Sequence, residues 1–471
     1  MKLLSVASEA FPLVKTGGLA DVVGALPDAL APHGVATTTL IPGYTVVGKA
    51  ITGAKVVQRW SSLMGVEARL LSATLGGHPL LVLDAPALFA RPGGLYDHVD
   101  DWHRFAALAR AAAEIAVRQR FDVLHAHDWQ AALAPAYLRY LPTTERKPAS
   151  VMTVHNIAFQ GRFGAEVFAN LGLPDDAYAI DGVEYYGGVG FLKAGLESAD
   201  AITTVSPTYA AEIREGRFGM GLEGLIESRR ERVYGIVNGI DPAVWNPESD
   251  TALPTRYTAR ALGRRKTNKR GVEAMFGLDT GDGPVFTVIS RLTWQKGMDV
   301  LAQCVDELVA LGGRLALLGS GDAHLEAAFL AAAARHPGRV GVKVGYDEPM
   351  SHLLQGGADA ILIPSRFEPC GLTQLYGLAY GCVPVVARTG GLADTVIDAN
   401  EAAIAAGVAT GFQHGETGYH TVAHAIRRAI AAYARPDLWC TIQRNGMRAD
   451  FSWGTSGRRY ADLYASLTGA A

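Results

Sequence analysis

The stretch that decides the fold is Lys15-Thr16-Gly17-Gly18-Leu19-Ala20-Asp21-Val22-Val23. An apolar run from Leu3 to Ala7 precedes it and predicts a strand, and apolar residues then recur at helical spacing from Ala20 to Leu30. A lysine and two glycines therefore lie where a strand passes into a helix. Glycines allow the backbone to approach a ligand, and a helix start offers unpaired N–H groups and a positive dipole end. The stretch predicts a site for a phosphate-bearing small molecule at the carboxyl end of a parallel strand.

The plainer alternative is an ordinary strand-to-helix turn with a solvated lysine. The stretch has neither the Gly-Lys-Ser/Thr ending of a P-loop nor the Gly-x-Gly-x-x-Gly pattern of a dinucleotide site. The choice between these readings therefore depends on the rest of the chain.

Composition limits the class of protein. The chain has 471 residues, 49% of them hydrophobic, and a net charge of −3, which predicts two to three packed domains without a basic field for nucleic acid. Its four cysteines show no Cys-x-x-Cys spacing, which is typical of a reducing cytosol rather than of a disulfide or zinc framework. The first residues are too soon interrupted, at Glu9, for a signal peptide, and no apolar run is long enough to span a membrane. We expect a cytoplasmic protein.

Strand-like and helix-like segments alternate through both halves of the chain, which favours an α/β fold with sheets covered on both faces. The turn-rich segment 238–247 interrupts this alternation and predicts a linker. We place one domain at residues 1–242, a second at 243–450 and a final helical segment at 451–471. The predicted fold has two Rossmann-like, doubly wound domains that face each other across a cleft, with part of the first sheet antiparallel. A ligand would bind where the carboxyl ends of both sheets meet.

A run of five cations follows the linker: Arg264, Arg265, Lys266, Lys269 and Arg270. Such a run could bind nucleic acid or could be a solvated helix face. No aromatic side chain interleaves with the cations, so we favour the solvated face and expect no nucleic-acid partner.

Two further segments follow predicted strands of the second half. Ser290–Gly297 places Arg291 and Lys296 five residues apart across a turn, so that both can reach one anion. Fixed cations in a water-poor site stabilise the charge that develops on a leaving nucleoside diphosphate, although paired surface cations are common. Pro364–Gln374 places Glu368 on a loop before a helix that we expect to begin near Gly371. Glu368 could accept hydrogen bonds from sugar hydroxyls, or could simply be an acid at a helix N-terminus.

Histidines end two predicted strands of the first half. His125 and His127 would share a face of their strand, with Asp128 next to them, but no third metal ligand is evident. His155 and Asn156 begin the second such segment, Val154–Gly161. Asn238 of the linker is either a pocket residue or a turn residue. We expect no metal site.

The segment Pro12–Pro27 resembles, nearly letter for letter, the N-terminal signature of bacterial glycogen synthases and plant starch synthases. The His segments, the Arg-x-x-x-Gln-Lys-Gly of 291–297, the Glu368 loop and the segment Thr389–Val396 match the same family, so the resemblance covers nearly the whole chain. Related retaining transferases carry a second Glu eight positions after the first. This chain has Tyr376 there, a departure that the synthases share.

The resemblance implies a GT-B type fold and a set of roles. Lys15 contacts the sugar nucleotide, Arg291 and Lys296 clamp its diphosphate, and Asp128 and His155 lie near the glucose. The first domain would take the acceptor and sugar, the second the nucleotide, and the last helix would pack back on the first domain. The predicted catalytic residues are His155, Arg291, Lys296 and Glu368. The predicted donor-binding residues are Lys15, Gly17, Gly18, Asp128, Asn156, Asn238, Cys370, Gly371, Leu372 and Thr373.

For activity, the resemblance implies a retaining glucosyltransferase that moves glucose from ADP-glucose to the non-reducing end of a 1,4-α-glucan such as glycogen. No cofactor is implied, and the leaving phosphate would help to deprotonate the acceptor hydroxyl. Ala20, where plant enzymes typically carry Gly, favours the bacterial branch. The preference for ADP over UDP comes from the family alone. A transferase with another acceptor, or a catalytically silent glucan-binding protein, remains an alternative, and a homo-oligomer is left open.

Overall fold

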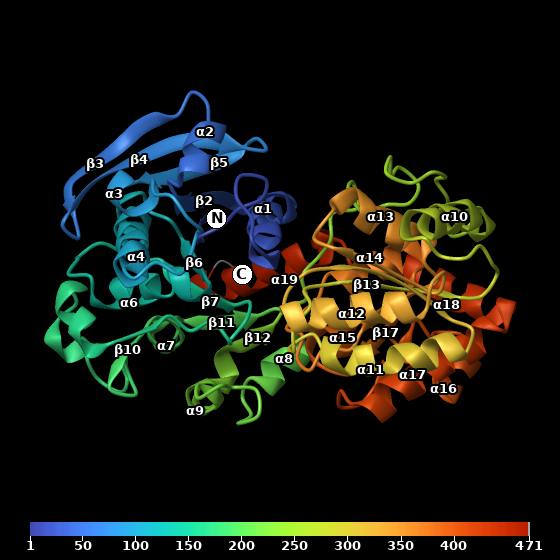
Figure 1. Ribbon diagram of the computed structural model, residues 1–471. Helices are drawn as coiled ribbons and strands as arrows, with labels where there is room; N and C mark the ends of the chain where they lie inside the picture. The colour runs from blue at the N-terminus through green and yellow to red at the C-terminus, as the bar shows by residue number, and fades with distance from the viewer. Residues whose placement is uncertain (470–471) are drawn as a thin grey trace. The chain divides into compact units, whose positions relative to one another are not determined.

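The computed structural model describes residues 1–469, and the chain divides into two compact units. The first unit comprises Met1–Gly239 together with the chain from Trp453, and the second comprises Ile240–Ser452. The unit boundaries thus lie within a few residues of positions 242 and 450. Figure 1 shows each unit as a sheet with helices against its faces.

The first unit contains a nine-stranded sheet in the order β12-β11-β7-β6-β1-β2-β5-β4-β3. Its strands are β1 (Lys2–Val6), β2 (Ala36–Pro42), β3 (Lys55–Leu63), β4 (Val66–Leu75), β5 (His78–Asp84), β6 (Val123–His127), β7 (Ala149–Val154), β11 (Ala201–Thr204) and β12 (Val233–Gly235). Strand β4 pairs antiparallel with both β3 and β5, while β5, β2, β1, β6, β7, β11 and β12 run parallel. The prediction of a partly antiparallel sheet is therefore confirmed. A separate antiparallel sheet joins β8 (Arg162–Phe163), β10 (Gly188–Gly190) and β9 (Glu184–Tyr185).

Helices cover both faces of this sheet. They are α1 (Gly18–Leu30), α2 (Thr45–Ala50), α3 (Pro86–Phe89), α4 (Asp101–Arg118), α5 (Asp128–Ala131), α6 (Leu133–Tyr140), α7 (Phe191–Ser198), α8 (Pro207–Glu212), α9 (Glu223–Ser228) and α19 (Trp453–Thr468). The last helix, α19, lies beside α1, and both bury apolar side chains, such as Leu26 and Tyr460, in one cluster with strand residues (Figure 1). The alanine-rich helix α4 is buried along most of its length.

The second unit contains a parallel six-stranded sheet in the order β15-β14-β13-β16-β17-β18. Its strands are β13 (Val285–Ile289), β14 (Arg314–Gly319), β15 (Val340–Val344), β16 (Ala360–Ile363), β17 (Val383–Ala387) and β18 (Phe412–His414). Its helices are α10 (Arg265–Phe276), α11 (Met298–Ala310), α12 (Ala323–Arg335), α13 (Glu348–Gly357), α14 (Thr373–Tyr380), α15 (Gly390–Thr395), α16 (Glu401–Ala405), α17 (Tyr419–Tyr433) and α18 (Pro436–Arg448).

In each sheet, parallel strands are added first on one side of the first strand and then on the other. The first unit starts at β1, adds β2 on one side and later places β6 on the other. The second unit does the same with β13, β14 and β16. Open α/β sheets bind ligands outside the carboxyl ends of the strands where the order reverses in this way. The loops after β1 and β6, and those after β13 and β16, are therefore where the fold favours a site.

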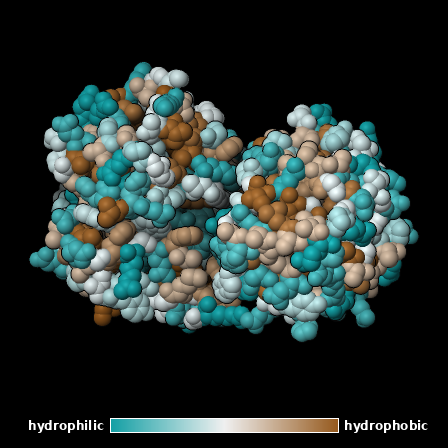
Figure 2. Space-filling model, in the orientation of Figure 1, coloured by the Kyte–Doolittle hydropathy of each residue, from teal (hydrophilic) through white to brown (hydrophobic). Residues whose placement is uncertain are grey.

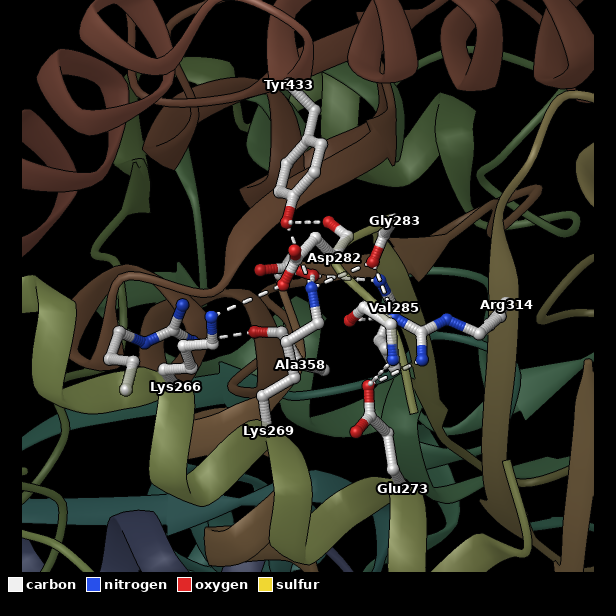
Figure 3. A network of polar contacts seen from close by, with 12 residues as sticks. Lys266, Lys269, Glu273, Asp282, Gly283, Val285, Arg314, Ala358 and Tyr433 are labelled. Carbon is white, nitrogen blue, oxygen red and sulfur yellow. Dashed lines mark hydrogen bonds and ion pairs between the residues drawn. The ribbon is translucent and has the colours of Figure 1, made fainter. Parts of the chain in front are cut away.

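The five-cation run contradicts the expectation of a solvated helix face at two positions, whereas Arg264 and Lys266 are exposed as expected. Arg265 and Lys269 on α10 are each only 6% exposed. The Arg265 guanidinium donates to the carbonyl oxygens of Gln355 and Ala358 at the end of α13, at 3.1 and 2.6 Å. Lys269 Nζ lies 2.7 Å from Asp359 Oδ2 and donates to Tyr433 (Figure 3). Buried carbonyls and a carboxylate at the amino ends of the strands need donors, and this sequence supplies them as buried cations.

Apolar side chains on the face seen in Figure 2 form small patches among hydrophilic ones. This is the ordinary distribution for a protein whose strands and helices bury their apolar faces inside each unit. Within residues 1–469, none of the helices combines the length and the apolar character that a membrane crossing requires.

Candidate active site

The loop after β1 leads directly into α1, as the sequence predicts. Gly17 is the residue before the helix, and the helix begins at Gly18. A Cβ added at Gly17 would meet no atom within 4 Å, so packing within the protein does not require glycine there. Lys15 is exposed and its Nζ lies 2.8 Å from Asp21 Oδ1 on the first turn of α1. The loop thus presents a cation and an open helix start, the two features that bind a phosphate.

A buried carboxylate that sequence reasoning did not assign holds this loop. Glu9 is 2% exposed and accepts hydrogen bonds from the backbone N–H of Thr16, from the Thr16 hydroxyl at 2.5 Å and from the Tyr96 hydroxyl. Burial, reinforced by the Glu9 charge, raises the pKa of Tyr96, so the phenol remains a donor. In the sequence, this role is indicated by an acidic residue, Glu9, that interrupts the first apolar run. Glu9 fixes the residue next to Lys15.

Asp128 and His155 meet although 27 residues separate them. Asp128 follows β6 with a φ of 54°, a left-handed conformation, and its Oδ1 accepts the backbone N–H of His155 at 2.7 Å. Burial raises the pKa of Asp128 to about 7, against the opposite effect of the backbone N–H groups of His155 and Asn156. The structure therefore brings three predicted site residues into one hydrogen-bonded group at the carboxyl edge.

The two histidines of β6 lie on one face of the strand, as the alternation predicts, with ring centroids 4.0 Å apart. Their nitrogens bond to protein groups: His125 to Tyr464 and Thr153, and His127 to Ser5 and His155. Across residues 1–469, no three His, Cys, Asp or Glu side chains are grouped as metal ligands. This arrangement gives the histidines hydrogen-bonding roles in the core.

Burial decides the charge of these rings. It lowers the pKa of His125 and of His155 to about 3, with the neighbouring His155 adding to the effect on His125, and it lowers that of His127 well below its usual value. A histidine with a depressed folded pKa stabilises the fold above its unfolded value of about 6.5, and this contribution is lost as the pH falls toward the folded pKa. Asp128 has a raised pKa and acts with the opposite sign, because its contribution is lost as the pH rises through about 7.

Asn238 lies at the end of the first unit and is 6% exposed. Its Oδ1 is buried and finds no hydrogen-bond partner among residues 1–469. A buried unpaired amide oxygen is costly, so it is expected to take a donor from a bound molecule or from water. The structure therefore favours the pocket reading of Asn238 over the turn reading.

In the second unit, two loops join at the reversal between β13 and β16. Lys296 Nζ, from the loop after β13, lies 2.6 Å from Glu368 Oε2, from the loop after β16. Ser365 is buried, and its hydroxyl donates to the same Oε2 at 2.8 Å. A Cβ on Gly297 would lie 2.0 Å from the carbonyl oxygen of Pro364, so only glycine allows the loops to approach. Arg291 is exposed, and its guanidinium has no ion pair or hydrogen bond within the described chain.

The helix after Glu368 begins two residues later than predicted. Gly371 has a φ of 71°, Leu372 is the residue before the helix, and α14 starts at Thr373. The backbone N–H groups of these three residues find no acceptor within residues 1–469. The group lies beside the cation Lys296 and its partner Glu368, so it forms an anion site of the kind the sequence predicts. Cys370, within the same loop, is buried.

The segment around Thr389 supports the Glu368 loop rather than standing apart from it. Gly390 has a φ of 43°, and a Cβ there would lie 1.9 Å from the Glu368 carbonyl oxygen. The Gly391 N–H donates to the same oxygen at 3.2 Å. These two glycines let α15 pack directly under the loop.

Two aromatic features of this unit were not assigned from sequence. Tyr376, in place of a second Glu, stacks on Trp245 with ring centroids 3.6 Å apart and planes at 12°. This explains why an aromatic residue suits the position. Tyr346, in the segment that follows β15, is 70% exposed near the carboxyl edge. Its hydroxyl donates to Glu348 Oε2 at 3.2 Å, and the sequence signal for it was a lone aromatic residue after a strand.

Comparison with known proteins decides the family. Residues 2–228 match the starch synthase catalytic domain, and residues 275–433 match the glycosyl transferases group 1. The chain is 64% identical to a glycogen synthase of Novosphingobium aromaticivorans and 60% identical to one of Mesorhizobium japonicum, in each case over 99% of both chains. The chain belongs to the glycogen synthase family.

Solved structures agree with this glycogen synthase assignment. The catalytic domain of starch synthase IV from Arabidopsis thaliana, solved with ADP and acarbose, superimposes with a TM-score of 0.91 at 30% identity over 99% of both chains. Sucrose-phosphate synthase from Thermosynechococcus elongatus shares the fold, with a TM-score of 0.63 at 17% identity over 100% of both chains. The predicted fold class, two Rossmann-like units of the GT-B type, is confirmed for this glycogen synthase family member.

Proposed function

We propose that the protein transfers glucose from ADP-glucose to the non-reducing end of a 1,4-α-glucan, with retention of configuration, and so elongates glycogen. The observation that carries this proposal is the group of Lys296, Glu368, Ser365 and the unpaired N–H groups before α14, at the strand-order reversal of the second unit. Such a group suits a diphosphate next to a polyhydroxylated sugar, because cations and N–H donors face the phosphates while the carboxylate accepts from hydroxyls.

The proposed roles follow from the chemistry of each group. Lys15, Arg291 and Lys296 bind the donor diphosphate and stabilise the negative charge that leaves with ADP. Glu368 orients the glucosyl hydroxyls, and Asp128 and His155 contact the same sugar. Fixed cations at a leaving group typically contribute several kcal/mol to the barrier. We propose that these side chains provide the charge stabilisation without a metal ion.

Retention is proposed to proceed without a glycosyl-enzyme intermediate. The buried carboxylates described for the site are Glu9, Asp128 and Glu368, and each is already engaged. Glu9 accepts from Thr16 and Tyr96, Asp128 from the His155 backbone, and Glu368 from Lys296. A retaining glycosidase instead needs a free pair about 5 Å apart on either side of the bond. The leaving phosphate oxygen is therefore proposed to take the proton of the acceptor hydroxyl on the same face of the sugar.

We place the reaction in the cytoplasm. The four cysteines Cys304, Cys370, Cys382 and Cys440 are all unpaired with one another, which suits a reducing compartment.

Label transfer tests the proposal. Purified protein is incubated with glycogen and either ADP-[¹⁴C]glucose or UDP-[¹⁴C]glucose, and polymer is precipitated and counted. We expect label in polymer from ADP-glucose and at least tenfold less from UDP-glucose. Preferential use of UDP-glucose would reassign the donor, transfer to a small sugar instead of glycogen would reassign the acceptor, and glycogen binding without any transfer would indicate a silent glucan-binding protein.

A further inference from the structure

The side chain of His155 is hydrogen-bonded to the buried residue His127, which is in turn hydrogen-bonded to the buried residue Ser5. His127 Nδ1 lies 3.1 Å from His155 Nε2, and His127 Nε2 lies 3.1 Å from the Ser5 hydroxyl oxygen. Ser5 and His127 are both completely buried. They lie on β1 and β6, and His155 follows β7, so this hydrogen-bonded chain crosses three strands that are neighbours in the sheet.

Hydrogen-bond rules couple the three residues. Two imidazole nitrogens that face each other need one proton between them, and a neutral ring carries only one N–H. If the Ser5 hydroxyl donates to His127 Nε2, His127 carries its proton on Nδ1 and donates to His155 Nε2. His155 must then carry its own proton on Nδ1. If Ser5 accepts instead, every proton along the chain moves to the other nitrogen.

The opposite edge of His155 is free to meet a ligand. Its Nδ1 has no hydrogen-bond partner within residues 1–469, and His155 as a residue is half-buried, whereas Ser5 and His127 are fully buried. Asp128 independently fixes the backbone N–H of His155 at 2.7 Å. The backbone and one ring nitrogen are therefore both held, while the second nitrogen points away from both partners.

We propose that Ser5 and His127 are positioning residues that fix the ring orientation and the tautomer of His155. The catalytic consequence rests on the proposed function, in which His155 contacts the glucosyl group of the donor. In that setting Nδ1 is the atom that meets the sugar, and whether it carries a proton follows from the direction of the Ser5–His127 hydrogen bond.

Two observations support positioning over simple packing. Burial keeps His127 and His155 uncharged, because it lowers the pKa of both rings, so the two rings can change tautomer only together, with every proton along the chain shifting at once. The adjacent His125 is as completely buried as His127, yet its nitrogens bond to Tyr464 at 2.8 Å and to Thr153, and neither of them bonds to His155. His125 is therefore a matched histidine outside the hydrogen-bonded series Ser5–His127–His155, which we call the relay.

The difference between His127, which bonds to His155, and His125, which does not, determines the choice of variants. His127→Phe keeps an aromatic ring in the core and removes both hydrogen bonds, and Ser5→Ala removes only the distal one. Tyr464→Phe is the control, because it removes an equally buried hydroxyl–imidazole bond from His125 without touching the relay. We expect His127→Phe to lower kcat roughly tenfold or more and Ser5→Ala roughly three- to tenfold, each with the KM for ADP-glucose within about twofold. Tyr464→Phe should keep kcat within about twofold.

Nitrogen chemical shifts of ¹⁵N-histidine-labelled protein provide the readout that does not depend on turnover. In the unmodified protein, the His155 ring should show one tautomer, and in Ser5→Ala and His127→Phe it should show a mixture. An unchanged tautomer in both variants overturns the relay, as does a loss of kcat in Tyr464→Phe equal to that in His127→Phe. If the unmodified protein transfers no glucose, the proposed function fails and the tautomer measurement still decides the relay. If His127→Phe does not fold, Ser5→Ala decides it.

Discussion

Replacing Lys296 by Met separates the catalytic role of this residue from its structural one. In the structure, Lys296 Nζ lies 2.6 Å from Glu368 Oε2, and the two side chains are 17% and 9% exposed. Methionine keeps the apolar stem and removes the charge. Glu368 then keeps one hydrogen-bond donor of the two that share its Oε2, the Ser365 hydroxyl at 2.8 Å.

The magnitudes follow from this geometry. A charged hydrogen bond contributes about 1.5–3 kcal/mol, and leaving a buried charge unpaired can cost more, so partial exposure suggests a loss of stability of about 1–3 kcal/mol. A loss of that size lowers the melting temperature by roughly 3–10 °C in a unit of this size. Loss of a fixed cation at the leaving diphosphate should lower kcat by roughly 10²–10³-fold.

Two further variants complete the test. The double variant Lys296→Met/Glu368→Gln removes both charges, and it should regain most of the melting temperature while kcat stays low. Lys269→Met breaks an ion pair of 2.7 Å at the amino edge of the same sheet, so it should lose stability while the folded protein keeps its kcat. Initial rates of glucose incorporation and scanning calorimetry measure both quantities. The reasoning is refuted if Lys296→Met keeps more than half of the original kcat, or if the double variant recovers activity together with stability.

Three other predictions concern the first unit and the loop supports. Burial lowers the pKa of His125 and His155 to about 3 and that of His127 well below its usual value, so the unfolded chain binds more protons at these three rings below about pH 6.5. They outweigh the single carboxyl of Asp128, whose raised pKa of about 7 acts in the opposite direction, and the free energy of unfolding should fall from pH 7 to pH 5. Equal urea midpoints at both values would contradict this. Gly391→Ala should lower both the melting temperature and kcat, since a Cβ there would lie 2.2 Å from a carbonyl oxygen of the Glu368 loop; unchanged kinetics would count against that support. Lys15→Ala should change stability by less than about 0.5 kcal/mol, because its ion pair is exposed, and should lower kcat/KM for ADP-glucose at least tenfold. Wild-type kcat/KM would remove Lys15 from the donor site.

Strands with strong apolar runs could be predicted from the sequence. The apolar runs at 285–289, 340–344 and 383–387 are evident in the sequence, and they coincide with β13, β15 and β17. In contrast, β3 (Lys55–Leu63) has polar and charged residues at most of its exposed positions and lies at the edge of its sheet, so no apolar run marks it. Strands β8 to β10 have two or three residues each, too few for any periodicity to show.

For the candidate site too, some features could be predicted from the sequence and others could not. Motifs after strands located Lys15, Arg291, Lys296 and Glu368 at carboxyl edges, because position in an α/β sheet follows from strand order. Sequence could not show that Lys296 pairs with Glu368 across 72 residues, nor that Tyr96 binds Glu9 across 87. Such contacts depend on which loops pack together in three dimensions.

The burial of two cations on α10 could not be predicted from the sequence either. Charge counting treats a lysine on a helix as solvated, yet Lys269 is buried because Asp359, a carbonyl and a tyrosine surround it. Pairing of this kind depends on residues about 90 and 164 positions away, which no local pattern reveals.

The central claim is that these residues transfer glucose from ADP-glucose to a glucan with retention. The most direct measurement is the ¹³C NMR spectrum of glycogen extended with ADP-[1-¹³C]glucose. The account predicts an enriched anomeric signal of α-1,4-linked glucose that grows with time and is lost in Lys296→Met. Enrichment in a β-linkage, or only in free glucose, would contradict it.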